Sequence, residues 1–308
     1  MSDSESLIRF LIKEGALFRE GNSQVGGNSK FLQFNYGGSE LVLKIYRGDV
    51  RRIRDARQRE FSAYLFLREN GFLCLPELHE TLEADDSICL EFISGTTPGC
   101  NKQTNQEILK SFLLLKEIYA RNRNFENAVD AALSTSDVLN QIRVRINLFD
   151  LSLKKEKELI VAVMRVLEAR HSINFPKHSL TYSFSDIGPH NMIMKDEKYY
   201  FLDLEFFGKD SAVKMILDYL LHPRNQFSFE DKVIALEWAE KELGIGLDLV
   251  INCAPFFAAK WATIIARRMT LEYRQQSLSD LKIDFERCLE IAILKDVSEI
   301  QDKLLNSR

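Results

Sequence analysis

Residues 183–205 constrain the fold of this chain more than any other segment. They read SFSDIGPHNMIMKDEKYYFLDLE. Because proline lacks a backbone N–H and glycine weakens a helix, the stretch around Gly188 and Pro189 cannot be a regular helix. A polar centre at 195–198 follows, with apolar and aromatic residues on both sides, and this pattern predicts a β-hairpin. The segment is therefore expected to form a loop followed by two paired strands.

Three side chains of this segment carry oxygen atoms at a spacing that suits metal-bound phosphates. Asp186 and Asn191 are five residues apart across the loop, and Asp203 follows the hairpin. A turn centred on Glu197 would place Asn191 opposite Asp203, with their Cβ atoms about 5 Å apart. Mg²⁺ prefers oxygen ligands of this kind. The alternative is an ordinary turn, since Asp, Gly, Pro and Asn are common turn formers.

A second hairpin is predicted upstream, at residues 30–46. Residues 30–35 and 40–46 have the composition of strands, and the Gly-Gly pair between them is a typical two-residue turn. Lys44 lies in the second strand between two apolar residues. It could extend its ammonium group to solvent from a strand edge. The other interpretation is a lysine held over a nucleotide.

Two neighbouring features fit a phosphate-binding lysine. Gly26 and Gly27 precede the hairpin, and a glycine turn lets the backbone approach phosphates closely. Residues 51–70 predict a helix with Glu60 midway along it, beside the apolar face expected to pack on the sheet. A lysine that points into a cleft needs a carboxylate partner. We therefore expect Glu60 to pair with Lys44.

Composition and charge exclude several partners. The net charge of −4, and the acids that interrupt the arginine-rich run at 47–59, argue against nucleic-acid binding. The beginning of the chain is too acidic for a signal peptide, and the most apolar stretch, 255–266, is too short to span a membrane. Five dispersed cysteines without a C-x-x-C pair indicate reduced thiols, and hence a cytoplasmic protein.

The pattern along the chain predicts two parts of different class. Residues 1–93 mix short strands with one long helix and include a hairpin at Asp85-Asp86. Downstream the periodicity is mainly helical, and helices are predicted at 104–123, 134–149, 152–171, 228–243, 254–274 and 279–293. We expect an α+β protein with domains at 1–93 and 94–308.

These residues together resemble the protein-kinase-like phosphotransferases of the aminoglycoside phosphotransferase and choline kinase family, and are most similar to bacterial members. The parts occur in the order typical of that family: Gly26-Gly27, Lys44, Glu60, the hinge-like segment 90–95, Asp186 with Asn191, and Asp203. SDIGPHN matches the family's catalytic loop, and LDLE at 202–205 matches its metal-binding strand. The resemblance implies a bilobal fold, with a small lobe of antiparallel sheet and one long helix, followed by a larger, mostly helical lobe.

The resemblance also implies a role for each matching residue. Asp186 would be the catalytic residue that accepts or orients the acceptor's hydroxyl proton. Asn191 and Asp203 would bind Mg²⁺. Glu205 would either join them as a further metal-site carboxylate or be a surface acid at the end of the strand. The nucleotide would contact Gly26, Gly27, Lys44 and Glu60, and its base would meet the backbone of Glu91 and Ile93. Residues 1–93 would then form the nucleotide-binding lobe, and residues 94–308 would form the catalytic and acceptor-binding lobe.

The implied function is a kinase that uses ATP, with GTP as an alternative donor, and Mg²⁺. It would transfer the γ-phosphate to a hydroxyl of a small molecule such as a sugar or an amino-alcohol. Phe184 replaces the histidine that the family commonly has two residues before its aspartate. This departure supports an alternative, a pseudokinase-type regulatory module that binds nucleotide without transfer. The D-F-G and A-P-E motifs of protein kinases are missing from the sequence.

Overall fold

The computed structural model describes residues 3–18, 24–25, 29–82, 84–270 and 277–306, which form two compact units. The first unit comprises Met1–Pro98 and Asn191–Phe207, and the second comprises Gly99–His190 and Gly208–Arg308. The assignment of 1–93 to a nucleotide-binding lobe and of 94–308 to a catalytic lobe stays a prediction.

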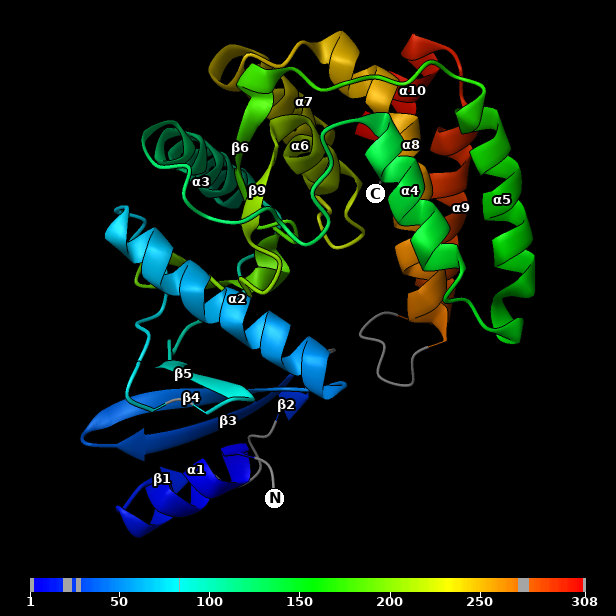
Figure 1. Ribbon diagram of the computed structural model, residues 1–308. Helices are drawn as coiled ribbons and strands as arrows, with labels where there is room; N and C mark the ends of the chain where they lie inside the picture. Colours follow the sequence, from blue (N-terminus) through cyan, green and yellow to red (C-terminus); the bar gives the residue numbers. More distant parts are fainter. Residues whose placement is uncertain (1–2, 19–23, 26–28, 83, 271–276, 307–308) are drawn as a thin grey trace. The chain divides into compact units, whose positions relative to one another are not determined.

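The first unit contains an antiparallel sheet with a helix on each face (Figure 1). Its strands run in the order β1-β3-β4-β5, and β2 pairs with β3. The elements are α1 (Asp3–Lys13), β1 (Leu17–Phe18), β2 (Gln24–Val25), β3 (Ser29–Tyr36), β4 (Ser39–Tyr46), α2 (Val50–Glu69) and β5 (Ser87–Glu91). The predicted hairpin at 30–46 and the predicted helix at 51–70 are confirmed by β3, β4 and α2.

Successive side chains of β4 point alternately to the two faces of the sheet. Leu41 and Leu43 pack with Leu11 of α1 in one apolar cluster. Because successive side chains of a strand point to opposite faces, Lys44 points to the other face, toward α2. The turn expected at Asp85-Asp86 is also present, since the Ser87 N–H donates to the Ala84 carbonyl at 3.1 Å.

The hairpin after the loop belongs to the first unit and has a register different from the predicted one. Strands β7 (Met192–Lys195) and β8 (Lys198–Phe201) pair with Lys195 opposite Lys198. The turn is the two-residue pair Asp196-Glu197, with φ of 48° and 61°. Asn191 is therefore offset by one residue from Asp203, and the prediction that they lie directly opposite was wrong. A turn centred on one residue was assumed, whereas a type I′ turn has two central residues with positive φ.

The second unit is mainly helical and includes a small two-stranded sheet, β6 (Leu180–Ser183) with β9 (Gly208–Ser211). Its longer helices are α3 (Lys102–Arg121), α4 (Thr135–Ile146), α5 (Lys154–Glu168), α6 (Ala212–Leu221), α7 (Phe229–Trp238), α8 (Leu247–Met269), α9 (Leu278–Ile293) and α10 (Val297–Leu305). Short turns of other helix types lie at Leu151–Leu153, Lys177–Ser179, Pro189–Asn191 and Ala239–Leu243. The six predicted helices are present, and α1 and α10 had not been assigned from the sequence.

Helix α8 is the central helix of this unit and contacts α4, α5, α6, α9 and α10 (Figure 1). It begins at Leu247, seven residues before its predicted start at 254, and continues through Pro255. Burial of most of its residues keeps the helix continuous despite the hydrogen bond that proline cannot donate. Among the described helices it alone is long and apolar enough to cross a bilayer, and 83% of its most apolar window is buried, as in a core helix.

The β7–β8 turn supplies a stability prediction. Replacing Glu197 with glycine should stabilise the protein by about 1 kcal/mol, because glycine adopts positive φ without the steric cost of a side chain. Gly37→Ala, in the β3–β4 turn where φ is 60°, should destabilise by a similar amount. Both changes can be measured by chemical denaturation. A destabilised Glu197→Gly variant would contradict the assigned turn.

Candidate active site

Lys44 of β4 lies among carboxylates in the first unit. Its Nζ is 2.6 Å from Glu60 Oε2 and 2.6 Å from Asp203 Oδ1. Glu60 is fully buried, and its Oε2 also accepts a hydrogen bond from the Tyr46 hydroxyl at 2.6 Å. The predicted pairing of Lys44 with Glu60 is confirmed. A lysine that is 3% exposed and paired in this way does not extend to solvent from a strand edge.

Three carboxylates lie close together around Lys44. Glu60, Asp203 and Glu205 each bring an oxygen within 4.8 Å of the others, and Lys44 is the cation paired with two of them. Burial alone would lower the pKa of Lys44, but Asp203, Glu60 and Glu205 outweigh it and raise that pKa. This donor set fits a hard divalent cation such as Mg²⁺.

The backbone at Asp203 is in an uncommon conformation. Asp203 has a φ of 62°, in the left-handed region that residues other than glycine seldom adopt. The next N–H, of Leu204, donates to Glu60 Oε1 at 3.3 Å. Helix α2 therefore fixes both the ammonium group of Lys44 and the backbone that presents Asp203. Strain of this kind persists where the surroundings over-determine the conformation, and it is frequent at functional sites.

The other predicted nucleotide and metal residues have the following positions. Asn191 ends the short helix before β7, and its carbonyl accepts from the Leu202 N–H at 2.9 Å. The Glu91 N–H, at the end of β5, donates to the Glu77 carbonyl at 2.8 Å, and Ile93 is buried just beyond. Gly26 and Gly27 lie outside the described residues. The binding roles of all these residues stay predictions.

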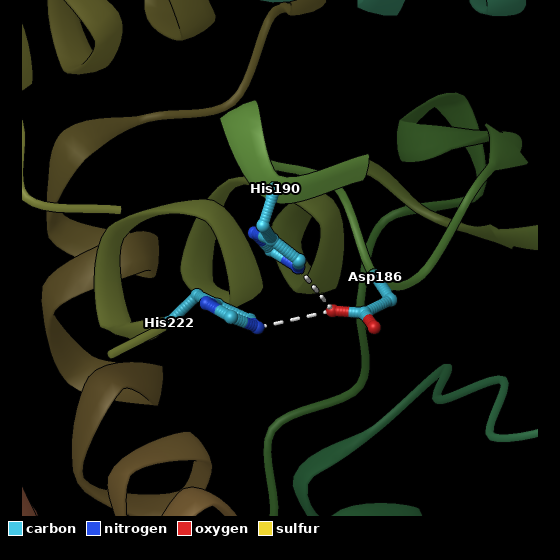
Figure 2. Close-up of side chains that lie close together, drawn as sticks. All are labelled: Asp186, His190 and His222. Carbon is cyan, nitrogen blue, oxygen red and sulfur yellow. Dashed lines mark hydrogen bonds and ion pairs between the residues drawn. The ribbon is translucent and has the colours of Figure 1, made fainter. Parts of the chain in front are cut away.

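Asp186 belongs to the second unit, in the loop between β6 and the Pro189–Asn191 turn. Two histidines face the same oxygen of its carboxylate (Figure 2). His222 Nε2 lies 3.0 Å and His190 Nε2 lies 3.4 Å from Asp186 Oδ1. The two imidazole rings stack with centroids 4.4 Å apart. Burial would raise the pKa of Asp186, but the contacts with both histidines outweigh it and hold that pKa well below its usual range.

The tautomer of His222 follows from its backbone contact. The Arg224 N–H donates to His222 Nδ1 at 3.0 Å, so this nitrogen carries no proton. Burial lowers the pKa of His222 to about 4, and the neutral ring must then carry its proton on Nε2, facing Asp186. A protonated nitrogen cannot ligate a metal. The ligand atoms of Asp186, His190 and His222 lie close enough together for a metal site. The two imidazole rings are instead arranged to orient the Asp186 carboxylate.

A buried polar network holds this loop in place. Lys214 of α6 pairs with Asp210 at 2.8 Å and Asp218 at 2.9 Å, and its Nζ also donates to Ser185 Oγ, beside Asp186. The Asn225 amide donates to the Ile187 carbonyl at 3.0 Å. A Cβ on Gly188 would come within 2.1 Å of Asn225 Oδ1, so this close approach requires glycine. The loop is therefore fixed by α6 and by the segment that follows it.

Solved structures with known activities share this fold. Spectinomycin phosphotransferase, solved with ADP and spectinomycin, has a TM-score of 0.58 at 14% identity, over 97% of this chain and 98% of that one. The choline kinase of Streptococcus pneumoniae has a TM-score of 0.62 at 12% identity, over 94% and 98% of the two chains. A choline/ethanolamine kinase family protein of Mesorhizobium loti has a TM-score of 0.59 at 13% identity, over 99% of each.

The chain has the kinase-like fold of aminoglycoside phosphotransferases and choline kinases. The predicted α+β class with this fold is thereby confirmed. No protein-family model and no curated protein matches the sequence. The convergence of Lys44 and Asp186 on one substrate stays a prediction.

Sequence reasoning missed the two histidines at Asp186. His190 lies four residues after Asp186, a spacing that could have suggested a contact across the turn. His222 carries no comparable signal, because it lies 36 residues along the chain from Asp186 and reaches it through α6.

The carboxylates around Lys44 give a first prediction for this site. Lys44→Met should destabilise the protein by about 3–5 kcal/mol, because it leaves buried carboxylates without their cation. Added MgCl₂ should then raise the unfolding temperature of Lys44→Met more than that of the wild type, since Mg²⁺ replaces the lost charge. The exposed Lys198→Met is the matched control. Equal Mg²⁺ effects on all three proteins would contradict a cation site here.

His222 gives a second prediction, for stability against pH. The pKa is about 4 in the folded protein and near 6.5 when unfolded, so the unfolded chain binds the proton first as pH falls. Stability should fall by about 3 kcal/mol between pH 6.5 and pH 4 from this residue alone. The slope of unfolding free energy against pH reports how many protons the chain takes up on unfolding. In that range, His222→Phe should lower this number by about one. The exposed His171→Phe should leave the slope unchanged.

Proposed function

We propose that the protein is an ATP-dependent phosphotransferase that moves the γ-phosphate to a hydroxyl of a small molecule. The observation that carries this proposal is the position of Lys44, held 2.6 Å from both Glu60 and Asp203 in a kinase-like fold. A lysine fixed by a helix carboxylate is preorganised to meet the inner phosphates of a nucleotide. The ADP-bound spectinomycin phosphotransferase of the same fold supports a nucleotide as the donor.

The residues of the first unit would hold the donor. Lys44 would bind the inner phosphates, and Glu60 would keep its ammonium group in place. Asn191, Asp203 and Glu205 would hold Mg²⁺, which when bound neutralises charge on the phosphates. The backbone of Glu91 and Ile93 would meet the adenine, and a guanine could use the same main-chain groups. Gly26 and Gly27 would approach the phosphates.

Asp186 would act on the acceptor. The acceptor oxygen forms a bond to the γ-phosphorus as the bond from that phosphorus to the bridging oxygen of ADP breaks, and the hydroxyl proton passes to Asp186. His222 and His190 both face Oδ1 and so hold the carboxylate in one orientation. The low pKa of Asp186 keeps it ionised at neutral pH and able to orient the hydroxyl. In a loose transition state this needs little basicity.

The cysteines support the proposed cytoplasmic location. All five are free thiols. Burial raises the pKa of Cys89 and Cys253 to about 12 and that of Cys288 to about 11, so these three are unreactive. Cys74 is exposed rather than part of the core. Free thiols are typical of proteins in reducing compartments.

The proposal is tested by ADP release with MgATP and a panel of sugars, amino-alcohols, nucleosides and aminoglycosides. Asp186→Asn should lower turnover at least about a hundredfold, because the acceptor proton loses its carboxylate. Nucleotide binding, measured by calorimetry, should persist. Asp196→Asn in the exposed β7–β8 turn is the matched control. Binding of MgATP with no transfer to any acceptor would favour the pseudokinase alternative raised by Phe184.

A further inference from the structure

The second unit contains a cavity that the proposed phosphotransferase chemistry does not use. Helices α4 and α5 both pack against α8 (Figure 1). A cavity of about 400 Å³ opens where the first turns of α4, the end of α5 and α8 meet. Asp186, His190 and His222 are not among the residues that line it. Its volume is in the range of cavities that bind small molecules, so its lining can be examined as a second binding site.

The deeper part of the cavity is apolar. Ser136, Leu139 and Arg143 line it from α4, and their spacing of three and four residues places them on one side of that helix. Phe256 lines it from α8. Leu139 and Phe256 are 8% and 1% exposed, so they form the buried apolar surface beneath the polar groups. Apolar surface with a few polar groups above it is the usual composition of a small-molecule site.

Two serines bring hydroxyl groups to the exposed part of the cavity. Ser136 Oγ and Ser172 Oγ are 2.7 Å apart, so one hydroxyl donates to the other. The accepting hydroxyl keeps its own hydrogen and can donate it to a ligand, and both oxygens retain lone pairs that can accept. The serine pair can therefore bind the hydroxyl groups of a ligand.

An ion pair presents a carboxylate to the same cavity. Arg143 Nη2 lies 2.6 Å from Glu168 Oε1, and Arg143 Nη1 donates to Asn140 Oδ1 at 2.6 Å. These two contacts hold the guanidinium group and, through it, the carboxylate. Glu168 Oε2 makes no hydrogen bond with the described residues and can accept one from a ligand hydroxyl.

Arg170 is the charged group of the lining that lacks an opposite charge beside it. Its Nη2 donates to the Leu294 carbonyl, and no carboxylate of the described residues lies within ion-pair distance. Arg170 is half-buried, and this burial lowers the pKa of its guanidinium group. Because Arg143 and Glu168 neutralise each other, the lining carries one net positive charge. A guanidinium group has five N–H donors, so donors remain for an anion.

We propose that this cavity binds a sugar-sized polyol that carries one anionic group, a phosphate or a carboxylate. Arg170 would bind the anionic group, while Glu168 and the two serines would bind the hydroxyls. Leu139 and Phe256 would pack against the carbon–hydrogen face of the ring. This second site goes beyond the proposed function and does not depend on it.

The ligand class can be tested by calorimetry on the intact protein at constant ionic strength. Glucose 6-phosphate and glucuronate are the anionic sugars, and glucose and inorganic phosphate each lack one part of the proposed ligand. At least one anionic sugar should bind about tenfold or more tightly than glucose and phosphate, because it uses both sets of contacts. The tighter of the two identifies the anionic group. Binding of both that is no tighter than that of glucose overturns the proposal.

Three variants locate the binding. Arg170→Gln should weaken binding of the anionic sugar about tenfold or more, because a charge-assisted contact is lost. Arg165→Gln, at an exposed arginine of α5 outside the lining, is the matched control and should bind like the wild type. Ser172→Trp, at an exposed position, should abolish binding by filling the cavity while leaving every charge in place. Equal affinity in Arg170→Gln and Arg165→Gln overturns the site, as does unchanged binding by Ser172→Trp.

One further variant separates this site from the candidate active site. Asp186→Asn should bind the anionic sugar like the wild type, whether or not the protein transfers phosphate. A loss of binding in Asp186→Asn, with none in Arg170→Gln, would place the sugar at the candidate active site and overturn the second site. Sugar binding that depends on Arg170, without ADP release with any acceptor, would retain the second site and overturn the kinase.

Discussion

The placement of one ammonium group among three carboxylates is the constraint on which the first unit depends. Lys44 is buried because Glu60 and Asp203 stabilise its charge, and Glu60 is buried because Lys44 and Tyr46 bind it. Neither residue could be buried without the other, since an isolated charge in a protein interior is very costly. The sheet and helix α2 are thus tied together by charge on one face, while apolar packing against α1 secures the other.

The second unit holds its charged residue, Asp186, in a different way. Asp186 lies in a loop rather than on a strand, so its orientation cannot come from the sheet. Two imidazole rings hold it, and His222 is itself held by the Arg224 backbone and the Trp261 ring. Phe184, in the place of a histidine common in kinase-like families, is 3% exposed and contributes packing instead. His190 and His222 thus supply polar support that Phe184 cannot.

The sequence predicted those features that are encoded locally. The β3–β4 hairpin follows from Gly37-Gly38 between two apolar strands, and Glu60 could be matched to Lys44 because helix and strand are adjacent in the chain. The register of β7–β8 was missed because one residue in the turn decides it, and neither Asp196 nor Glu197 signals a positive φ. The contact of His222 with Asp186 was out of reach for another reason: it depends on how the end of α6 packs against the Asp186 loop, which no local pattern specifies.

The order of the chain has a consequence for how the first unit is completed. Its Asn191–Phe207 segment is separated from Met1–Pro98 by more than ninety residues of the second unit. During synthesis, Lys44 and Glu60 leave the ribosome long before Asp203, so the early sheet lacks one of the groups that stabilise its buried ammonium ion. No single cut of the polypeptide can release the first unit intact. The charged centre of Lys44, Glu60 and Asp203 can therefore form only after about two-thirds of the protein has been made.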